Sequence, residues 1–404
     1  MARATVTERA RAERLDAEDP LAAFRERFVI EDPDTIYLDG NSLGRLPLAT
    51  RARIGELVDQ WGAELVGGWH DWIDLPARVG DLIGEAVLGG RPGETIVSDS
   101  TTVNLYKLAA ALLAERRGAI LGDIGDFPTN RYVLDGLVKT FGGSLHLTRE
   151  GLADALTSGQ EIALVCLSHV DYRTGELLDT EEVEALSPAP VIWDLSHSAG
   201  IARPRGIRFA VGTTYKYLNG GPGAPAFLYV REDSLAQLTS PIQGWFGQAD
   251  QFAMGEDYEP APGVRRFLAG TPNVPALVAI EEGVKLVAEA GVDRLRTKAE
   301  ALTSYAVELH DAWLAPLGFE LWSPRDPARR GAHVSVRHEQ GWPICRALIE
   351  RAKVIPDFRE PDLIRLGLAP LYTRFADVHD ALDRLRDLVE RGDYDRAAPR
   401  SRVT

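Results

Sequence analysis

Lys216 stands in a setting that suits covalent chemistry. It follows the short apolar run of residues 209–215 and precedes the glycine-rich stretch 217–223, so we expect it between a strand and a turn. Tyrosines flank it on both sides. Partial burial lowers the pKa of a lysine and makes its amine a nucleophile for Schiff-base formation. A lysine in an exposed loop would fit the same local sequence.

Asp194 and His197 follow a second expected strand. The apolar run 191–193 ends directly at Asp194, and His197 comes shortly after it. In open α/β sheets this carboxyl edge is where ligands bind. A buried carboxylate needs a partner, and the N–H of a pyridinium ring would serve. The competing interpretation makes Asp194 the N-cap of a following helix.

Two further segments complete a pattern. Thr101 and Thr102 lie where a strand is expected to pass into a helix, and hydroxyls with free amides at a helix N-terminus bind phosphate. Threonine is also a common helix cap. Phe127, after another expected strand, offers a ring for stacking or an anchor for its loop. A Schiff-base lysine, an acid, a phosphate cradle and a stacking ring together indicate pyridoxal 5′-phosphate.

Other reactive residue types fit ordinary positions. Lys107, Lys285 and Lys298 fall within helical patterns, where we expect them on solvated faces. Cys345 falls on the apolar side of a helical pattern, which is typical of core packing. Among the histidines only His197 has a placement that favours function, and no pair has metal-ligand spacing.

The elements that must position these residues alternate along the segment 95–230. Apolar strands without polar alternation are typical of a parallel sheet covered by helices on both faces. The expected strands are residues 95–97, 119–121, 144–147, 162–167 and 191–193, and the expected helices are residues 101–117, 132–140 and 180–186.

Beyond residue 275, long amphipathic helices and short strands indicate a smaller α+β unit. We therefore predict an α/β fold with a large ligand-binding domain at residues 51–274 and a small C-terminal domain at residues 275–404. Residues 1–50 lack a core of their own, and we expect them to pack against one or both domains.

Composition excludes several classes of protein. The chain has 404 residues, of which 45 % are apolar, so it can bury a large core. Its net charge of −15 counts against nucleic-acid binding, and no apolar run is long enough to span a membrane. The charged N-terminal segment does not fit a signal peptide. With Cys166 and Cys345 alone we expect no disulfide framework and no metal site, and we predict a cytoplasmic protein.

Several motifs resemble the kynureninase family of fold-type-I pyridoxal-phosphate enzymes. They are residues 37–44, 101–104, 126–130, 194–197, 214–223, 244–247 and 364–372. Residues 40–44 (Gly-Asn-Ser-Leu-Gly) and 215–219 (Tyr-Lys-Tyr-Leu-Asn) are specific to that family. The resemblance implies hydrolysis of the Cβ–Cγ bond of L-kynurenine, 3-hydroxy-L-kynurenine or both in tryptophan catabolism. The products would be anthranilate or 3-hydroxyanthranilate, and L-alanine.

The resemblance also implies site roles. Lys216 would bind the cofactor and move protons, Asp194 would pair with the ring nitrogen, and Tyr215 would bind phosphate and share in proton transfer. The other cofactor-binding residues it implies are Thr101, Thr102, Phe127, Pro128, Thr129, Asn130, Ser168, His197, Trp245 and Thr271. The substrate-binding residues it implies are Asn41, Ser42, Trp69, His70 and Arg365, whose guanidinium would bind the substrate carboxylate.

Asn130 departs from the family pattern, because many members have Asp at this position. Asn keeps the shape and loses the charge, so an electrostatic role there is in doubt. A cysteine desulfurase, an aminotransferase and a non-catalytic cofactor-binding protein remain as alternatives on the same scaffold. The desulfurase needs an attacking cysteine on a loop, whereas Cys345 falls in a helical pattern. By analogy with fold-type-I enzymes we expect a homodimer.

Overall fold

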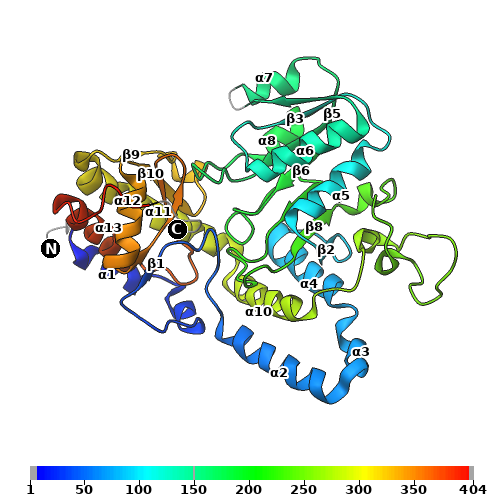
Figure 1. Cartoon of the computed structure of the whole chain (residues 1–404), viewed down its shortest axis with the longest axis horizontal. Helices are drawn as coiled ribbons and strands as arrows, with labels where there is room; N and C mark the ends of the chain where they lie inside the picture. The colour runs from blue at the N-terminus through cyan, green and yellow to red at the C-terminus, as the bar shows by residue number, and fades with distance from the viewer. Residues whose placement is uncertain (1–6, 149–150, 400–404) are drawn as a thin grey trace.

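The computed structural model describes residues 7–148 and 151–399. A seven-stranded sheet with helices on both faces forms the larger part, and a four-stranded sheet with helices forms the smaller part (Figure 1). This is the α/β architecture predicted from the sequence. No helix in the two described ranges combines the length and the apolar character needed to cross a bilayer.

The large sheet has the strand order β2-β8-β7-β6-β5-β3-β4. Its strands are β2 (Thr95–Ser98), β3 (Ala119–Gly122), β4 (Ser144–Leu147), β5 (Ile162–Ser168), β6 (Val191–Asp194), β7 (Phe209–Gly212) and β8 (Ala226–Val230). Neighbouring strands are parallel except at β8, which runs antiparallel to β2 and β7. The strands predicted between residues 95 and 193 are all present.

Alternate side chains of the central strands enter two separate apolar layers. In β5, Val165 and Leu167 face one layer, whereas Leu164 and Cys166 face the other. The first layer is covered by α2 (Leu48–Glu64), α3 (Trp69–Trp72), α4 (Leu75–Ile83), α7 (Leu152–Thr157), α8 (Thr180–Leu186) and α10 (Val274–Ala290). The second is covered by α5 (Thr101–Leu113), α6 (Pro128–Phe141) and α9 (Glu232–Leu235). Burial on both faces explains why the central strands carry no polar alternation, whereas the edge strand β4 alternates and exposes Ser144 and His146.

Two helices have bounds that differ from the prediction. α5 ends at Leu113 rather than at residue 117, and the chain turns back toward β3 through Gly118, whose φ of +128° favours glycine. α6 begins at Pro128 rather than at residue 132. Proline suits this first turn because the amide it lacks would have no partner within the helix.

The smaller part is built on an antiparallel sheet of order β12-β13-β10-β9. Its strands are β9 (Glu320–Leu321), β10 (His333–Arg337), β12 (Asp357–Arg359) and β13 (Leu363–Gly367). Its helices are α11 (Val292–Leu309), α12 (Gly341–Arg351) and α13 (Phe375–Glu390). β1 (Ile36–Tyr37) pairs in parallel with β11 (Val354–Ile355), so the N-terminal segment joins this part of the structure.

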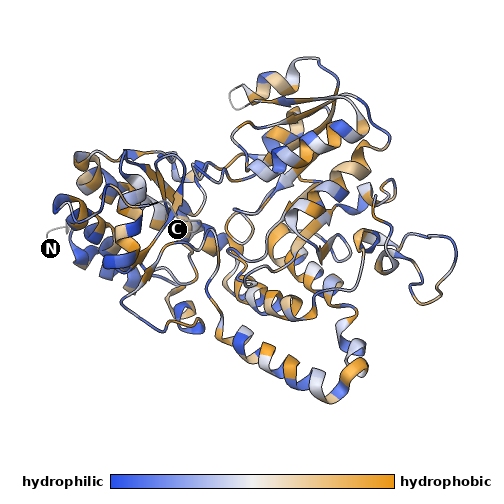
Figure 2. Cartoon of the chain, in the orientation of Figure 1, coloured by the Kyte–Doolittle hydropathy of each residue, from blue (hydrophilic) through white to orange (hydrophobic). Residues whose placement is uncertain are grey.

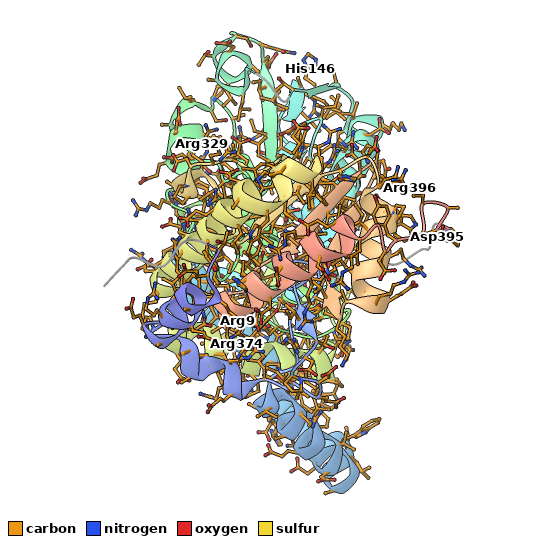
Figure 3. All side chains as sticks on the ribbon, turned by 90° about the vertical axis from the view of Figure 1, so that its left-hand side faces the viewer. Arg9, His146, Arg329, Arg374, Asp395 and Arg396 are labelled. Carbon is orange, nitrogen blue, oxygen red and sulfur yellow. The ribbon has the colours of Figure 1, made fainter. Side chains whose placement is uncertain are left out.

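The N-terminal helix α1 (Arg9–Ala17) lies beside α13 (Figure 3). Arg9 pairs with Asp380 of α13 at 2.9 Å. The Asp16 carboxylate accepts hydrogen bonds from the amides of Phe375 and Ala376 at 2.7 and 3.0 Å. A carboxylate at a helix N-terminus satisfies free amides and interacts favourably with the helix dipole. The N-terminal segment therefore caps the last long helix of the chain.

The turn that carries Lys216 is packed between two glycines from distant segments. A side chain at Gly44 would come within 2.4 Å of the Lys216 carbonyl oxygen, and the Gly44 amide donates to the Tyr215 carbonyl at 2.8 Å. A side chain at Gly283 of α10 would come within 2.1 Å of the Leu218 carbonyl oxygen. Both glycines allow a backbone approach that no larger residue permits.

Gly283→Ala should therefore destabilise the fold, although alanine favours helices. The added methyl group must displace the backbone of the lysine turn, and overpacking of this kind costs about 1–3 kcal/mol. Gly136→Ala in α6 is the matched control, because nothing lies within 4 Å of its added methyl group. The control should leave stability unchanged or raise it by up to about 1 kcal/mol. Urea unfolding measures both, and equal free energies of unfolding for the two variants would contradict the packing argument.

Candidate active site

A cavity of about 580 Å³ opens at the carboxyl edge of the large sheet. Ser168 and Asp194 end β5 and β6, and Thr213 follows β7, so three neighbouring parallel strands end in its wall. The predicted residues that line it are Thr101, Thr102, Phe127, Thr129, Asn130, Ser168, Asp194, His197, Tyr215, Lys216 and Thr271. This is the sheet edge at which the sequence placed a ligand.

Lys216 enters the cavity from the turn after β7. Its Nζ lies 2.8 Å from Nε2 of the buried His197. Burial lowers the pKa of Lys216 to about 7, with Asp194 opposing this shift and Arg365 and Arg359 adding to it. Burial and the Lys216 charge also hold the pKa of His197 well below its usual value. Near neutral pH the pair therefore supplies an amine that is neutral in a large fraction of molecules.

Asp194 is buried at the end of β6. Its Oδ1 accepts a hydrogen bond from the Ser196 amide at 2.9 Å, and its Oδ2 accepts one from Nδ2 of Asn130, also at 2.9 Å. The residues that follow, 195–202, form turns and no helix. The interpretation of Asp194 as the N-cap of a following helix is therefore wrong, and its carboxylate faces the cavity.

A second buried acid, Asp126, lies beside this carboxylate. The Asn130 amide group that donates to Asp194 also donates to Asp126 at 3.3 Å, so it bridges the two acids. Asp126 also accepts hydrogen bonds from the Phe127 amide and the Ser168 hydroxyl. Burial and the negative charge of Asp194 raise the pKa of Asp126 to about 7.

This bridge explains why asparagine suits position 130 better than aspartate would. A neutral amide can donate to two carboxylates at once, whereas an ionised Asp would add a third acceptor to the pair. Asp126 is a site residue that the sequence did not reveal. The sequence feature that could have identified it is its position shortly after β3, at the same sheet edge where β6 ends with Asp194.

The part of the cavity wall at the start of α5 offers donors for an anion. Thr101 and Thr102 form the first turn of α5, and Ser100 caps this helix by accepting from the Val103 amide at 3.3 Å. Tyr215 and Thr271 line the same cavity. A helix N-terminus with hydroxyl groups suits a phosphate, while Asp194 and Lys216 suit a pyridine nitrogen and a carbonyl carbon. The donor set therefore fits pyridoxal phosphate.

Phe127 lines the cavity with its ring 45 % exposed. Its ring meets that of Tyr172 edge to face, with centroids 5.3 Å apart. Tyr172 lines the cavity too, and the sequence analysis did not name it. The part of the cavity wall that Phe127 and Tyr172 form is therefore aromatic, which suits a flat ligand.

The residues implied in carboxylate binding form a separate buried group. Arg365 of β13 pairs with Asp357 of β12, and its Nη2 donates to the Ser42 hydroxyl at 3.1 Å. Its Nη1 donates to the Tyr172 carbonyl, which connects this group to the cavity. Asn41 packs against Gly367 of β13, where an added Cβ would lie 1.9 Å from its Oδ1. Within the described residues neither Arg365, Ser42 nor Asn41 lines the cavity wall itself.

Within the part of the chain that the structure describes, four other implied residues do not line this cavity. Trp245 is 41 % exposed on a surface turn, where its ring packs on Phe246 and Phe252. Pro128 occupies the first turn of α6, and His70 is exposed on the short helix α3. Trp69 lines an adjoining cavity of about 430 Å³, which shares Thr271 with the main one.

The structure also corrects the placement of two lysines. Lys107 and Lys298 are buried rather than solvated, because Asp99 and Asp19 supply them with carboxylate partners at 2.7 and 2.6 Å. Lys285 is half exposed, as predicted. His333 was given no role, yet its fully buried ring lies 5.8 Å from that of His197.

Comparisons with known proteins agree with this geometry. The family model described as "Kynureninase C-terminal domain" matches residues 295–385. The kynureninase of Pseudomonas fluorescens is 40 % identical over 397 residues, covering 93 % of this chain and 94 % of the relative. The chain belongs to the kynureninase family. The kynureninase of Burkholderia pseudomallei (strain K96243) is 39 % identical with the same coverage.

Solved structures share the fold at lower identity. The cysteine desulfurase of Thermococcus onnurineus NA1 superposes with a TM-score of 0.75 at 19 % identity, covering 94 % of this chain and 98 % of that one. A C-DES mutant with glycine covalently linked to its PLP cofactor gives a TM-score of 0.77 at 18 % identity, covering 88 % and 97 %. At this identity the likeness shows the fold, which is that of the fold-type-I enzymes.

Asp126→Asn should change how stability depends on pH. Because folding raises the pKa of Asp126 from 3.8 to about 7, its protonation favours the folded state, and this contribution is lost as the pH rises through 7. The Tm of the variant relative to the parent should therefore rise between about pH 4 and pH 7 and level off above pH 7.

Asp135→Asn, which removes an exposed carboxylate from α6, the helix that begins two residues after Asp126, is the control. Thermal unfolding of the three proteins across this pH range measures the effect. A constant difference between the Asp126 variant and the parent would mean that Asp126 does not titrate between its two states as described.

Proposed function

We propose that this protein hydrolyses the Cβ–Cγ bond of L-kynurenine, 3-hydroxy-L-kynurenine or both, and releases L-alanine with the corresponding anthranilate. It is a pyridoxal-phosphate-dependent hydrolase of the kynureninase family. The observation that carries the proposal is the placement of a low-pKa lysine and a buried carboxylate on one cavity in a chain of this family.

The residues of the main cavity would hold the cofactor. Asp194 would accept a hydrogen bond from the ring nitrogen, and Thr101, Thr102 and Tyr215 would donate to the phosphate. Phe127 would cover one face of the ring. When bound, the cofactor supplies an electron-withdrawing ring that takes up the negative charge left at the substrate when a bond to carbon breaks.

Lys216 is the residue proposed to move protons. Its amine would hold the cofactor covalently at rest and, when free, would act as a general base at the substrate Cα. A base works best when its pKa lies near the working pH, and Lys216 with its pKa of about 7 meets this condition. His197, at 2.8 Å from Nζ, orients the lysine.

Tyr215 and Arg365 would complete the substrate side. Tyr215 lines the cavity next to Lys216 in sequence, so its hydroxyl can serve as acid and base at the substrate γ-carbonyl while it binds phosphate. Arg365 would bind the substrate carboxylate as a bidentate fork. Asp357 now holds this guanidinium, so the substrate carboxylate must share or replace that partner.

The desulfurase alternative lacks a suitable nucleophile. Cys345 is buried in α12, and burial raises its pKa to about 12. Cys166 is buried in β5, and its pKa is raised as well. Since the thiolate is the attacking species, neither cysteine suits sulfur transfer. The free, buried thiols are in keeping with the reducing cytoplasm, and we place the protein there, which cell fractionation would check.

The reaction is tested by incubating the holoenzyme with L-kynurenine, with 3-hydroxy-L-kynurenine and separately with L-cysteine. We expect equal amounts of alanine and the matching anthranilate from at least one of the first two, and no sulfide from cysteine. Lys216→Ala should abolish turnover, because both the cofactor anchor and the base are lost.

The same variant gives a readout that is independent of turnover. Borohydride reduction followed by mass spectrometry should find the cofactor attached to Lys216 in the parent and no attached cofactor in Lys216→Ala. Lys285→Ala, which removes a half-exposed lysine from α10, is the control and should behave as the parent. Sulfide release, or a parental rate in Lys216→Ala, would refute the proposal.

We also propose that the protein is a homodimer. α2 projects at the lower edge of the molecule, and apolar residues gather at its outer end (Figures 1 and 2). Trp61, Leu65 and Val66 are between 63 and 81 % exposed there, and with Trp69 and Thr271 they line the adjoining cavity. Exposed apolar surface of this kind marks a site of association, and this surface is continuous with the main cavity through Thr271.

The dimer is tested by sedimentation of the parent and of Trp61→Glu. The molar mass of the parent from sedimentation should be twice the 44.2 kDa of one chain. The molar mass of the variant should shift toward that of the monomer, because the substitution places a charge in the apolar surface. Tyr132→Glu, on the exposed side of α6, is the control and should remain dimeric. A parent protein that sediments as a monomer would contradict the proposal.

A further inference from the structure

Asp99 places a carboxylate in the wall of the cavity at the end that suits an anion. It directly follows β2 and lines the cavity with Ser98, Ser100 and Thr101. An acid here should repel a phosphate group, because like charges at short range disfavour one another. Its backbone also has a φ of +51°, which is uncommon for a residue other than glycine. The Asp99 carboxylate therefore needs a compensating positive charge.

Lys107 supplies one. It lies two turns along α5, and its side chain is completely buried. Its Nζ donates to Asp99 Oδ2 at 2.7 Å, to the Ser98 hydroxyl at 3.2 Å and to the Phe267 carbonyl at 2.7 Å. Three acceptors match the three donors of an ammonium group. Burial lowers the pKa of Lys107, and the Asp99 charge opposes this shift.

These contacts join two walls of the cavity. Ser98 and Asp99 belong to the wall that leads into α5, and the Asp99 carbonyl accepts from the Ala226 amide of β8 at 2.8 Å. Phe267 directly precedes residues 268–273, which form part of the cavity wall and include Thr271. The ammonium group of Lys107 therefore fixes both segments relative to the first turn of α5.

We propose that Lys107 is a positioning residue for the phosphate end of the site. It neutralises Asp99 and holds the two walls together, so that the first turn of α5 accepts the phosphate dianion. The proposal rests on the proposed function for the identity of the anion. It concerns cofactor affinity alone, so its failure would leave the outcome of the kynurenine assay unaffected.

The test compares pyridoxal phosphate with pyridoxal, which lacks the phosphate, in binding to apoenzyme followed by protein fluorescence. Lys107→Met keeps the length of the side chain and removes its charge. It should weaken the binding of pyridoxal phosphate about tenfold or more, because Asp99 then faces the phosphate without a partner. Binding of pyridoxal should change much less. Lys285→Met is the matched control for the loss of a lysine from a helix and should bind both ligands as the parent does.

Adding Asp99→Asn to Lys107→Met should restore most of the affinity for pyridoxal phosphate, since the uncompensated charge is gone. The single variant Asp99→Asn keeps Lys107 and should bind pyridoxal phosphate several-fold more tightly than the parent, with pyridoxal unchanged. This variant tests the proposal even if Lys107→Met does not fold. Equal loss of both ligands in Lys107→Met, no recovery in the double variant, or weaker binding of pyridoxal phosphate by Asp99→Asn would overturn it.

Discussion

The partial withdrawal of the Lys216 amine from water is the constraint on which the rest of the site depends. Burial favours the neutral amine, and His197 holds the nitrogen at 2.8 Å. The lysine turn keeps this position because Gly44 and Gly283 let two other segments approach its backbone directly. The chemistry of one side chain is thus tied to packing contacts made by two residues that do not line the cavity.

Buried charges around that amine are balanced locally. Asp194 and Asp126 share the amide of Asn130, Lys107 neutralises Asp99, and Arg365 is held by Asp357. Each acid in these groups has a donor or a cation within hydrogen-bonding distance, as burial of polar groups requires. The site can therefore carry many ionisable groups beside the two apolar layers of the large sheet.

The sequence predicted what depends on neighbours along the chain. Lys216, Asp194 and Thr101 stand at strand or helix ends, so local pattern alone placed them on one edge of the sheet. Lys107 was misjudged because its third acceptor belongs to Phe267, which is 160 residues away in sequence. Asp357 and His333 were missed for the same reason, since strand pairing in the small sheet sets their positions. Trp245, by contrast, was placed by resemblance, and a surface turn holds it outside the cavity.

The lysine turn has a consequence for how the enzyme is made. Its walls come from residues 44, 214–220 and 283, so a nascent chain contains all three only once residue 283 of the 404 has been added. A chain synthesised only as far as the lysine turn contains Lys216 but lacks the contact from Gly283 that holds this turn in place. The packing that fixes the lysine turn is therefore complete only when α10 has folded against it.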